Sequence, residues 1–246
     1  MKTPRFYSPT PFVEGEVCDL DENASHHIGK VLRMQSGQPV SLFNGDGKDY
    51  FATLVNIGKR TVSVTIDQIQ SNTSESPLRT HIGQAVSKGD RMDYMIQKSV
   101  EMGTHQITPL VTERCEVRLK GDREEKRIAH WQQVAISAAE QCGRAVVTEI
   151  RPVMHLNDWL AEKSADECAL VLHHRTTQAL QSLPVPTRVR LLIGPEGGLG
   201  EAEINQALTF GFIGTTLGPR VFRTETAPVA ALATLQWLWG DFGTHP

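Results

Sequence analysis

The stretch that most constrains the fold runs from Leu191 to Pro228. An apolar run, Leu191–Ile193, leads into a glycine-rich loop, Gly194–Gly200, and a helix-like pattern follows. A β-like run, Phe212–Thr216, leads into a second glycine loop, Leu217–Arg220. Strand, glycine loop and helix form the local pattern of a ligand site in α/β folds, because glycine takes positive φ and lets the backbone approach a ligand. We therefore expect both loops to face one flat ligand that is neutral or mildly cationic.

Two familiar nucleotide-binding patterns are absent from the first loop. A P-loop ends in Gly-Lys followed by Ser or Thr, whereas this loop ends Gly198-Leu199-Gly200-Glu201. A dinucleotide fingerprint needs a third glycine three residues after the second, and the residues after Gly200 are Glu, Ala and Glu. The acidic residue expected about 20 positions further on is missing from residues 214–218. The loop therefore indicates neither a P-loop nor a dinucleotide site.

Helices are expected after both loops. The first places three apolar residues on one side, at Ile204, Ala207 and Leu208. The second is strongly apolar and runs to Trp239. Thr224 or Thr226 can cap its N-terminus, and Pro228 is tolerated in its first turn.

Composition is that of a globular protein, with 246 residues, 39% hydrophobic and 22% charged. The chain has no N-terminal signal pattern and no 18-residue apolar run, so we expect a cytoplasmic protein with no membrane partner. Its four cysteines form no Cys-x-x-Cys pair and are read as free thiols. A net charge of −3 argues against nucleic-acid binding by bulk charge, so any such contact must come from local patches.

Residues 1–70 are expected to form a small β-barrel. A short helix over Asn23–Arg33, capped by Asn23 or Ser25 and ending near Gly37, precedes three β-like runs separated by hairpin turns. The runs are Pro39–Phe43, Asp49–Ile57 and Thr61–Ile69. The next stretch is polar and lacks an apolar pattern, so residues 71–78 are expected to link the barrel to a second domain over residues 79–246.

Strands and helices alternate through the second domain, which predicts an α/β fold with a mostly parallel sheet. The expected strands are Thr80–Val86, Ile107–Val111, Cys168–His173 and the two described above. The expected helices are Asp90–Met102, Glu124–Cys142, Leu156–Lys163 and the two described above. Ligands of such sheets lie beyond the C-terminal ends of the strands. The strand ends near His173, Gly194 and Leu217 are therefore expected to share one site.

Charged residues of the two loops have two interpretations each. Arg220 and Arg223 either lie on the solvated surface, paired with Glu225, or hold an anion and stabilise developing negative charge. Glu196 either caps neighbouring backbone amides or accepts a hydrogen bond from a ligand. The chain offers no metal-binding spacing, since neither pair of adjacent histidines has it. Cys142, which ends a helix, is read as a small buried residue rather than a nucleophile.

Arginine lies beside aromatic residues at the start of the chain, in the sequence Pro4-Arg5-Phe6-Tyr7. Such a cluster is ordinary surface in most proteins, but arginine with aromatic residues also binds RNA. Lys30 and Arg33, with Lys59 and Arg60, can extend the patch, or each can belong to a charged solvated face.

These motifs together resemble the ribosomal RNA small subunit methyltransferase E family, of the SPOUT class of knotted methyltransferases. The resemblance covers nearly the whole chain and rests on PRFY, HHIGKVLRMQSGQPVSLFNGDG, KGDRMDYMIQKSVEMGT, ITPLVTERCEV, AAEQCGR, LLIGPEGGLGEAEI and TLGPRVFRTETA. It implies a PUA-like RNA-binding barrel at residues 1–70 and an α/β trefoil-knot domain at residues 79–246. A threaded chain is an exception to the usual topology.

The resemblance also implies an activity, which is transfer of a methyl group from S-adenosyl-L-methionine to N3 of one uridine in 16S rRNA. That uridine lies in the decoding region of the 30S subunit, and members of the class are homodimers. Arg220, Arg223 and Glu225 would be catalytic, and Arg5, Lys30 and Arg33 would bind RNA. The implied cofactor contacts are Leu172, His173, Gly194, Glu196, Gly197, Gly198, Leu217, Gly218, Val221 and Phe222. No metal is implied.

Three rival interpretations remain at the level of the sequence. A SPOUT methyltransferase acting on tRNA or 23S rRNA shares the fold, a non-catalytic RNA-binding or assembly protein shares the barrel, and a nucleotide-dependent oxidoreductase shares an α/β site. The missing dinucleotide fingerprint disfavours the third rival.

Overall fold

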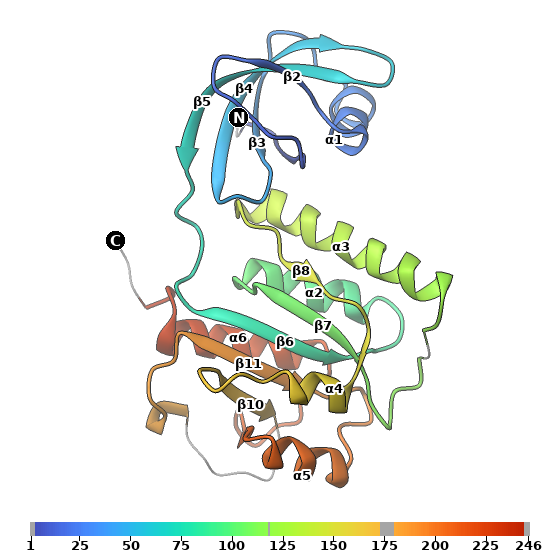
Figure 1. The fold of residues 1–246 in the computed structure, drawn as a ribbon, viewed down its shortest axis with the longest axis vertical. Coiled ribbons are helices and arrows are strands. Elements are labelled where there is room, and N and C mark those ends of the chain that lie inside the picture. Colours follow the sequence, from blue (N-terminus) through green and yellow to red (C-terminus); the bar gives the residue numbers. More distant parts are fainter. Residues whose placement is uncertain (1–2, 118, 173–179, 244–246) are drawn as a thin grey trace. The chain divides into compact units, whose positions relative to one another are not determined.

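The computed structural model describes residues 3–117, 119–172 and 180–243 (Figure 1). The chain divides into two compact units. The first contains Met1–Glu75 together with Ala139–Val147, and the second contains Ser76–Ala138 and Thr148–Pro246. The end of a long helix is thus grouped with the first unit, a segment that the predicted division at residues 71–78 did not include.

The first unit is built on a five-stranded sheet in the order β1-β3-β4-β5-β2. The strands are β1 (Arg5–Tyr7), β2 (Val17–Asp19), β3 (Pro39–Phe43), β4 (Lys48–Ile57) and β5 (Val62–Ser71). β1 runs parallel to β3, and the other pairs are antiparallel. Alternate residues of β4 and β5 are buried, which is the pattern of a sheet with one face on a core. Phe6, Leu42, Tyr50, Leu54 and Ile66 belong to that core.

The three predicted runs of the barrel are confirmed as β3, β4 and β5. β1 and β2 were not predicted, because strands of three residues carry too little alternation to be recognised. The predicted helix is α1 (Glu22–His26), which continues into a π-helical turn, η1 (His27–Val31). Its predicted caps were wrong, since the Asp21 side chain accepts the hydrogen bond from the Asn23 amide at 3.1 Å. The helix ends before Gly37 because Arg33 takes a positive φ of 51°.

The second unit contains a sheet in the order β12-β10-β11-β6-β7-β8, with β9 paired to β7, and every pair is parallel. The strands are β6 (Arg79–Ala85), β7 (Gln106–Val111), β8 (Glu149–Ile150), β9 (Met154–His155), β10 (Cys168–Leu172), β11 (Arg188–Ile193) and β12 (Ile213–Thr215). The helices are α2 (Arg91–Glu101), α3 (Asp122–Cys142), α4 (Leu156–Ala161), α5 (Glu201–Thr209), α6 (Thr226–Trp239) and a 3₁₀ turn, η2 (Leu180–Ser182).

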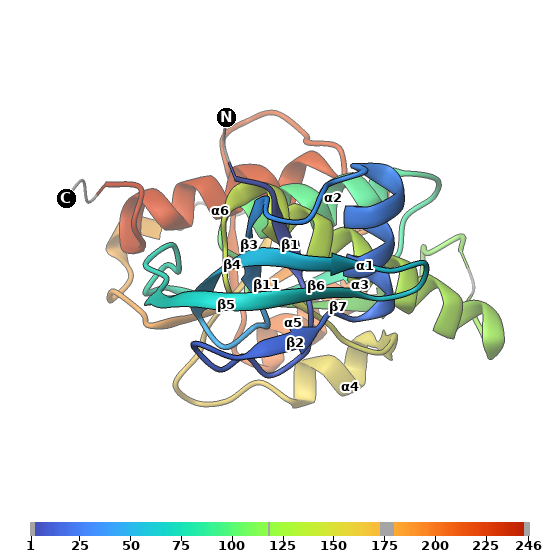
Figure 2. The same cartoon turned by 90° about the horizontal axis from the view of Figure 1, so that it is seen from above.

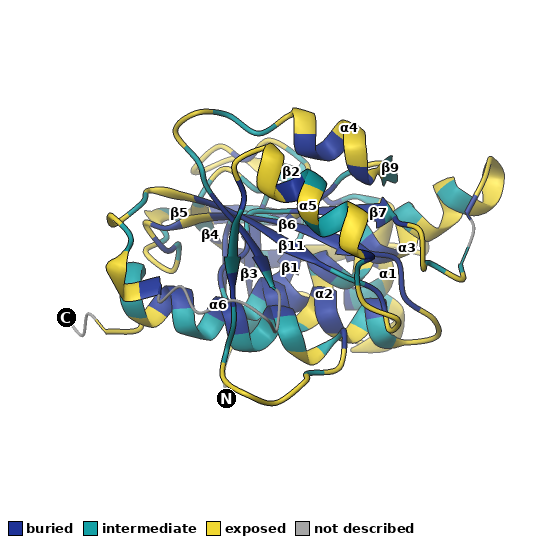
Figure 3. Ribbon diagram, turned by 90° about the horizontal axis from the view of Figure 1, so that it is seen from below, coloured by how far each residue is buried: buried dark blue, intermediate teal, exposed yellow. Residues whose placement is uncertain are grey.

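Helices cover both faces of this parallel sheet, as its buried strands require. Figures 2 and 3 show α4 and α5 on one face and α2 and α6 on the other, with buried residues turned toward the sheet. Side chains of α4 and α5 join those of β10 and β11 in one apolar cluster, and α6 packs against α2 and β11. Among the described residues, no helix is long and apolar enough to cross a membrane.

The predicted parallel α/β sheet is confirmed, and each predicted strand and helix of the second unit has a counterpart. The two-residue strands β8 and β9 were not predicted, because their parallel partner β7 lies far away in the sequence. Ala207 of α5 is buried as expected, but Leu208 is 45% exposed, so the expected apolar side is narrower than the sequence indicated. The predicted threonine caps of α6 were wrong: Glu225 occupies the N-cap position, with no side-chain hydrogen bond to the helix. Pro228 lies in the first turn, as expected.

The buried Trp159 organises one face of the second unit. A side chain at Gly83 of β6 would place its Cβ 2.6 Å from the Trp159 ring, so glycine is required there. The indole Nε1 donates to His81 Nε2 at 3.2 Å, and His81 Nε2 also lies 2.8 Å from the Thr108 hydroxyl. The guanidinium of Arg190 lies 4.8 Å from the ring centroid. Burial, with Arg190 and Arg151 nearby, lowers the pKa of His81 from 6.5 to about 3.

Because His81 stays neutral in the fold, we expect acid to destabilise this unit before carboxylates titrate. The unfolded chain takes up the proton below about pH 6.5, so His81 contributes its full stability above that pH and loses it as the pH falls toward 3. The free energy of unfolding should fall by up to about 1.4 kcal/mol per pH unit in this window. Urea titrations of the wild type and His81→Gln between pH 6.5 and 5 measure it. The free energy of unfolding of His81→Gln should fall less steeply with falling pH than that of the wild type, and the exposed His155→Gln control should behave like the wild type. The same slope in all three proteins would show that His81 is not the residue responsible.

Candidate active site

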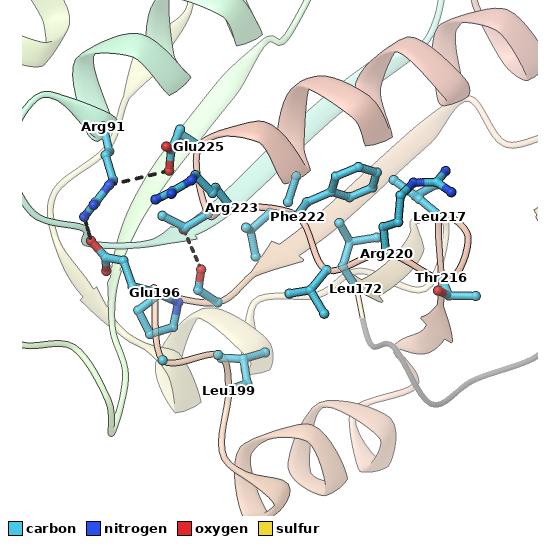
Figure 4. Close-up of a pocket in the computed structure, with 18 of the residues that line it drawn as sticks. Arg91, Leu172, Glu196, Leu199, Thr216, Leu217, Arg220, Phe222, Arg223 and Glu225 are labelled. Atoms are coloured by element: carbon cyan, nitrogen blue, oxygen red, sulfur yellow. Dashed lines mark hydrogen bonds and ion pairs between the residues drawn. The ribbon is translucent and has the colours of Figure 1, made fainter.

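A cavity of about 620 Å³ lies at the C-terminal ends of β10, β11 and β12 (Figure 4). Both glycine loops line it, as the sequence predicted. Its lining comprises Arg91, Leu172, Ile193 to Leu199, Thr215 to Leu217, Arg220 to Glu225, and Ala227. The cavity belongs entirely to the second unit.

The first glycine loop folds back tightly on itself. Its turn is closed by the Gly198 amide, which donates to the Pro195 carbonyl at 2.9 Å, and Gly198 has a φ of +68°. A Cβ at Gly194 would lie 2.9 Å from the Leu199 amide nitrogen. Side chains are therefore excluded at Gly194 and strained at Gly198, which leaves the loop backbone facing the cavity.

Thr224 joins the two loops. Its hydroxyl donates to the Gly194 carbonyl at 2.8 Å and accepts a hydrogen bond from Gln84 Nε2 at 3.0 Å. All three residues are buried or partly buried. The hydroxyl that was expected to cap α6 instead fixes the end of β11 against the segment that enters α6.

Arg91, the first residue of α2, connects the same two segments through charge. Its Nη1 lies 2.5 Å from Glu196 Oε1, and its Nε lies 3.7 Å from Glu225 Oε2 (Figure 4). The Lys88 amide also donates to Glu196 Oε1 at 3.0 Å. Glu196 therefore holds backbone and guanidinium groups of its own chain, which is the structural role that the sequence left open.

The environment of Glu196 favours its ionised form. Burial acts to raise the pKa of Glu196, but hydrogen bonds from the Lys88 amide, from its own amide and from Arg91 outweigh burial, and the pKa is lowered below its usual value. The acid that anchors the first loop is thus a charged partner for Arg91 at neutral pH.

Arg220 ends the second loop and Arg223 lies in the segment that leads from it to α6, and both residues are exposed at the cavity. Within the described part of the chain, neither guanidinium has a hydrogen-bond or ion-pair partner. The expected surface pairing with Glu225 is not found, because Glu225 is paired with Arg91. Figure 4 places Arg223 beside Arg91 and Glu225, and Arg220 beside Phe222 and Leu217. Both arginines therefore remain available to a ligand.

Two buried polar atoms of the lining have no hydrogen-bond partner among the described residues. One is Oε2 of Glu225, whose negative charge lies at the N-terminus of α6, where the helix dipole favours it. The other is the hydroxyl of Thr215, which is 1% exposed. Buried polar groups in proteins nearly always find partners, so the Thr215 hydroxyl marks a place where a ligand can bind, whereas Glu225 Oε2 already lies 3.7 Å from Arg91 Nε.

Most residues named from the sequence lie together in this cavity. Its lining includes Leu172, Gly194, Glu196, Gly197, Gly198, Leu217, Val221 and Phe222 from the expected cofactor contacts, and Arg220, Arg223 and Glu225 from the expected catalytic set. Gly218 is not part of the lining, although its φ of +86° shapes the second loop. His173 lies outside the described residues. The individual roles of these residues stay predictions.

The residues expected to bind RNA belong to the first unit. Arg5 makes its contacts within its own unit. It pairs with Asp49 at 2.6 Å, donates a hydrogen bond to the Arg144 carbonyl, and places its guanidinium 4.0 Å from the Phe43 ring centroid. Only 11% of its side chain is exposed. Lys30 and Arg33 are exposed. RNA binding by all three stays a prediction, with Lys30 and Arg33 better placed to contact a large partner.

Sequence reasoning missed Arg91 and Thr224 as members of the site. Arg91 was placed on a helix but not at a strand end, although β6 ends six residues before it and lies next to β11. If the end of β6 had been counted with the other three strand ends, Arg91 would have been predicted to lie near the site. Thr224 was assigned to a helix cap, and its bond to residue 194 depends on tertiary structure.

Comparison with known proteins agrees with this fold. A family model for an RNA methyltransferase domain matches residues 74–236, and a model for the PUA domain of RNA methyltransferases matches residues 20–67. The first match spans more than half of the chain. The chain is therefore an RNA methyltransferase of the SPOUT class with a small PUA-like barrel, as the resemblance implied.

Relatives identify the family more narrowly. Ribosomal RNA small subunit methyltransferase E of Buchnera aphidicola (from Schizaphis graminum) is 37% identical over 98% of both chains, and that of Bacillus subtilis is 30% identical over 86% of both. The enzyme of this name from Neisseria gonorrhoeae, solved bound to S-adenosyl methionine, is 39% identical with a TM-score of 0.92, covering 98% of this chain and 99% of that one. A putative methyltransferase from Legionella pneumophila, solved with SAM, is 40% identical with a TM-score of 0.95, covering 98% and 100%. This chain belongs to the ribosomal RNA small subunit methyltransferase E family.

Because Arg91 connects the two segments, we expect Arg91→Gln to loosen both. The pairs are partly exposed, so their loss should cost about 1 kcal/mol or less, which corresponds to a few-fold faster local opening. Amide hydrogen exchange should accelerate at Lys88, whose amide donates to Glu196, and at Thr226 and Ala227, whose amides donate to the Arg223 carbonyl.

The matched control is Arg151→Gln, which removes the ion pair with Glu162 elsewhere in the unit. It should leave exchange at these amides unchanged. Unchanged exchange in Arg91→Gln, or the same acceleration in the control, would show that Arg91 does not hold the two loops.

Proposed function

We propose that this chain transfers the methyl group of S-adenosyl-L-methionine to N3 of one uridine in the decoding region of 16S rRNA. The observation that carries the proposal is the cavity itself, where two glycine loops meet a carboxylate and two arginines whose guanidinium groups have no partner among the described residues. Membership of the family supports the reaction class and the small-subunit substrate. The particular base, the atom and the 30S context rest on the family resemblance and on the chemistry of the site.

The cavity fits the cofactor. About 620 Å³ is within the usual range for a small-molecule site, and loop backbone forms much of the wall, which suits an adenine held by amides and carbonyls. Leu172 and Leu217 supply apolar contacts, and the Thr215 hydroxyl is a polar group with no partner in the described part of the chain. The loop residues of the lining, with Gly218 shaping the second turn, would hold the cofactor. When bound, S-adenosyl-L-methionine supplies an electrophilic methyl group.

The protein must make uracil N3 a nucleophile. N3 carries a proton, and removing it leaves negative charge shared over O2 and O4. The unpaired guanidinium groups of Arg220 and Arg223 are suited to stabilise that charge, because donors fixed in advance cost no reorganisation during the reaction. Glu225 is suited to accept the proton, or to orient an arginine. The N3 lone pair then forms the new bond to the methyl carbon as the bond from carbon to sulfur breaks.

Arg91 gives this scheme a positioning residue. It holds the Glu225 carboxylate from one side while it anchors the first loop through Glu196. The carboxylate and the loop that holds the cofactor are therefore fixed to the same guanidinium. Since a misplacement of about 1 Å can cost 100-fold in rate, such fixing favours catalysis.

The first unit is proposed to hold the RNA. N3 lies on the pairing edge of uracil, so the target must be unpaired or flipped out before it reaches the cavity. The exposed Lys30 and Arg33 are suited to contact phosphates around it. Within this scheme, residues 1–70 bind RNA, residues 71–78 connect the domains, and residues 79–246 carry out the reaction in the cytoplasm.

We also propose that the chain forms a homodimer through α6. This helix is apolar on its exposed side as well as on the side that packs against the sheet. The helix carries no charged residue over Thr226–Trp239, and Trp237 is 65% exposed. Phe242, just beyond the helix, is also exposed. An exposed aromatic on an uncharged helix is typical of a subunit interface.

Methyl transfer from labelled S-adenosyl-L-methionine to 30S subunits lacking the modification tests the reaction. A methyl group on N3 blocks pairing, so we expect label in 16S rRNA and a new reverse-transcription stop at one uridine of the decoding region. Arg223→Ala should reduce the rate about 100- to 1,000-fold with little change in cofactor Kd. The control is Arg188→Ala, at the opposite end of β11, which should retain activity.

Each other outcome has a definite meaning. Label without a stop would place the methyl group on another atom, and transfer only to tRNA or 23S rRNA would replace the substrate. Cofactor binding without transfer to any RNA would favour a non-catalytic RNA-binding protein. Normal turnover by Arg223→Ala would remove the charge-stabilising role of this arginine.

The dimer is tested by a charge placed on α6. We expect Trp237→Glu to raise the dimer Kd at least about 30-fold, because burying an unpaired carboxylate at an aromatic contact is costly. Light scattering across a concentration series measures it. Val185→Glu, a similarly exposed position outside α6, should leave the mass unchanged. A monomeric wild type, or a fully dimeric Trp237→Glu, would contradict the proposal.

A further inference from the structure

A second depression, of about 660 Å³, adjoins the candidate active site in the same unit. Its lining comprises Lys88, Gly89, Asp90, Arg91, Tyr94, Glu225 and Thr226. Arg91 and Glu225 also line the first cavity, so this ion pair is a wall common to both. A molecule in the depression would therefore touch the group assigned to the proton transfer.

The lining combines an aromatic face with charged groups of both signs, namely Lys88 and Arg91 beside Asp90 and Glu225. Tyr94 is 48% exposed, although it is a large ring on a well-formed helix. It follows Arg91 by three residues in α2, and residues at that spacing lie on the same face of a helix. Lys88 pairs with Glu116, and both side chains are more than half exposed. Such a pair contributes little to stability, so the ammonium can exchange its partner for a stronger anion.

We propose that this depression receives the target nucleotide of the RNA, with Tyr94 stacking on the flipped pyrimidine and Lys88 binding an adjoining phosphate. The inference rests on the proposed function and adds the place of the substrate. A base taken out of its stack loses stacking energy, and an exposed ring can replace it. In this position the pairing edge of the base lies beside Arg91 and Glu225, where the two cavities adjoin, so that N3 can approach the methyl group of the cofactor directly.

The chemistry of the lining favours a nucleotide over a protein partner. Tyr94 is its one large apolar surface, and charged or glycine residues form most of the remainder. A docking site for a helix or a second copy of the chain would present several apolar side chains, as α6 does. One aromatic face beside a cation matches one base and one phosphate.

Steady-state methylation of 30S subunits by Tyr94→Ala tests the inference. Loss of one contact between a base and an aromatic ring should raise KM for 30S subunits about 5- to 150-fold. Cofactor Kd, measured by calorimetry, should stay within about two-fold of the wild type, since Tyr94 does not line the first cavity. Tyr94→Phe, which keeps the ring, should restore KM. The matched control is Phe210→Ala, which removes another exposed aromatic of this unit outside both cavities.

Photocrosslinking locates the base directly. An RNA carrying 4-thiouridine at the methylated position should crosslink to the peptide containing Tyr94. An unchanged KM in Tyr94→Ala, a crosslink that maps elsewhere, or loss of the dimer in Tyr94→Ala would overturn the inference while leaving the methyltransferase assignment in place. Failure of the wild type to methylate any RNA would overturn the proposed function itself, so the two failures are distinguishable.

Discussion

The hydrogen bond from the Thr224 hydroxyl to the Gly194 carbonyl is the interaction on which the site depends. It joins the end of β11 to the entry of α6, so that two residues 30 positions apart in the sequence hold the two loops in one wall. Arg91 adds a second connection, through Glu196 and Glu225, from a helix more than 100 residues earlier in the chain. A neutral hydroxyl and a guanidinium thus fix three segments around one cavity. Backbone that faces a ligand needs such support, because glycine loops have no side chains with which to pack.

Much of the fold could be predicted, for physical reasons that apply to each element. The strands β4 and β5 alternate buried residues with more exposed ones, β3 is a short apolar run, and glycine turns separate the three, so these signals are all local. Strands β1, β2, β8 and β9 have two or three residues and exist because a partner strand is present, so local sequence says little about them. The cap of α1 was predicted too late in the chain, because Asp21, whose backbone is extended (ψ 169°), already accepts the hydrogen bond from the Asn23 amide.

The parts of the site that are contiguous in the sequence were predicted. The parts that come together only through tertiary structure were missed. The glycine spacing indicated both loops, and the charged residues beside the loops could then be predicted as members of the site. Arg91 carries no local signal, because an arginine at the start of a helix is usually solvated surface. Its role follows from the parallel sheet, which places the end of β6 beside the end of β11. The same order of strands places the depression with Tyr94 next to the cavity. Arg91 lines both, so the residue that holds the loops would also contact the proposed substrate.

A crystal structure of this chain with S-adenosyl-L-homocysteine and a short RNA containing the target uridine tests the account most directly. We expect the sulfur between the two glycine loops, the pyrimidine stacked on Tyr94 beside Arg91 and Glu225, and its N3 pointing directly at the sulfur. A cofactor bound away from these loops, or a base that reaches it without touching either residue of that pair, would contradict it.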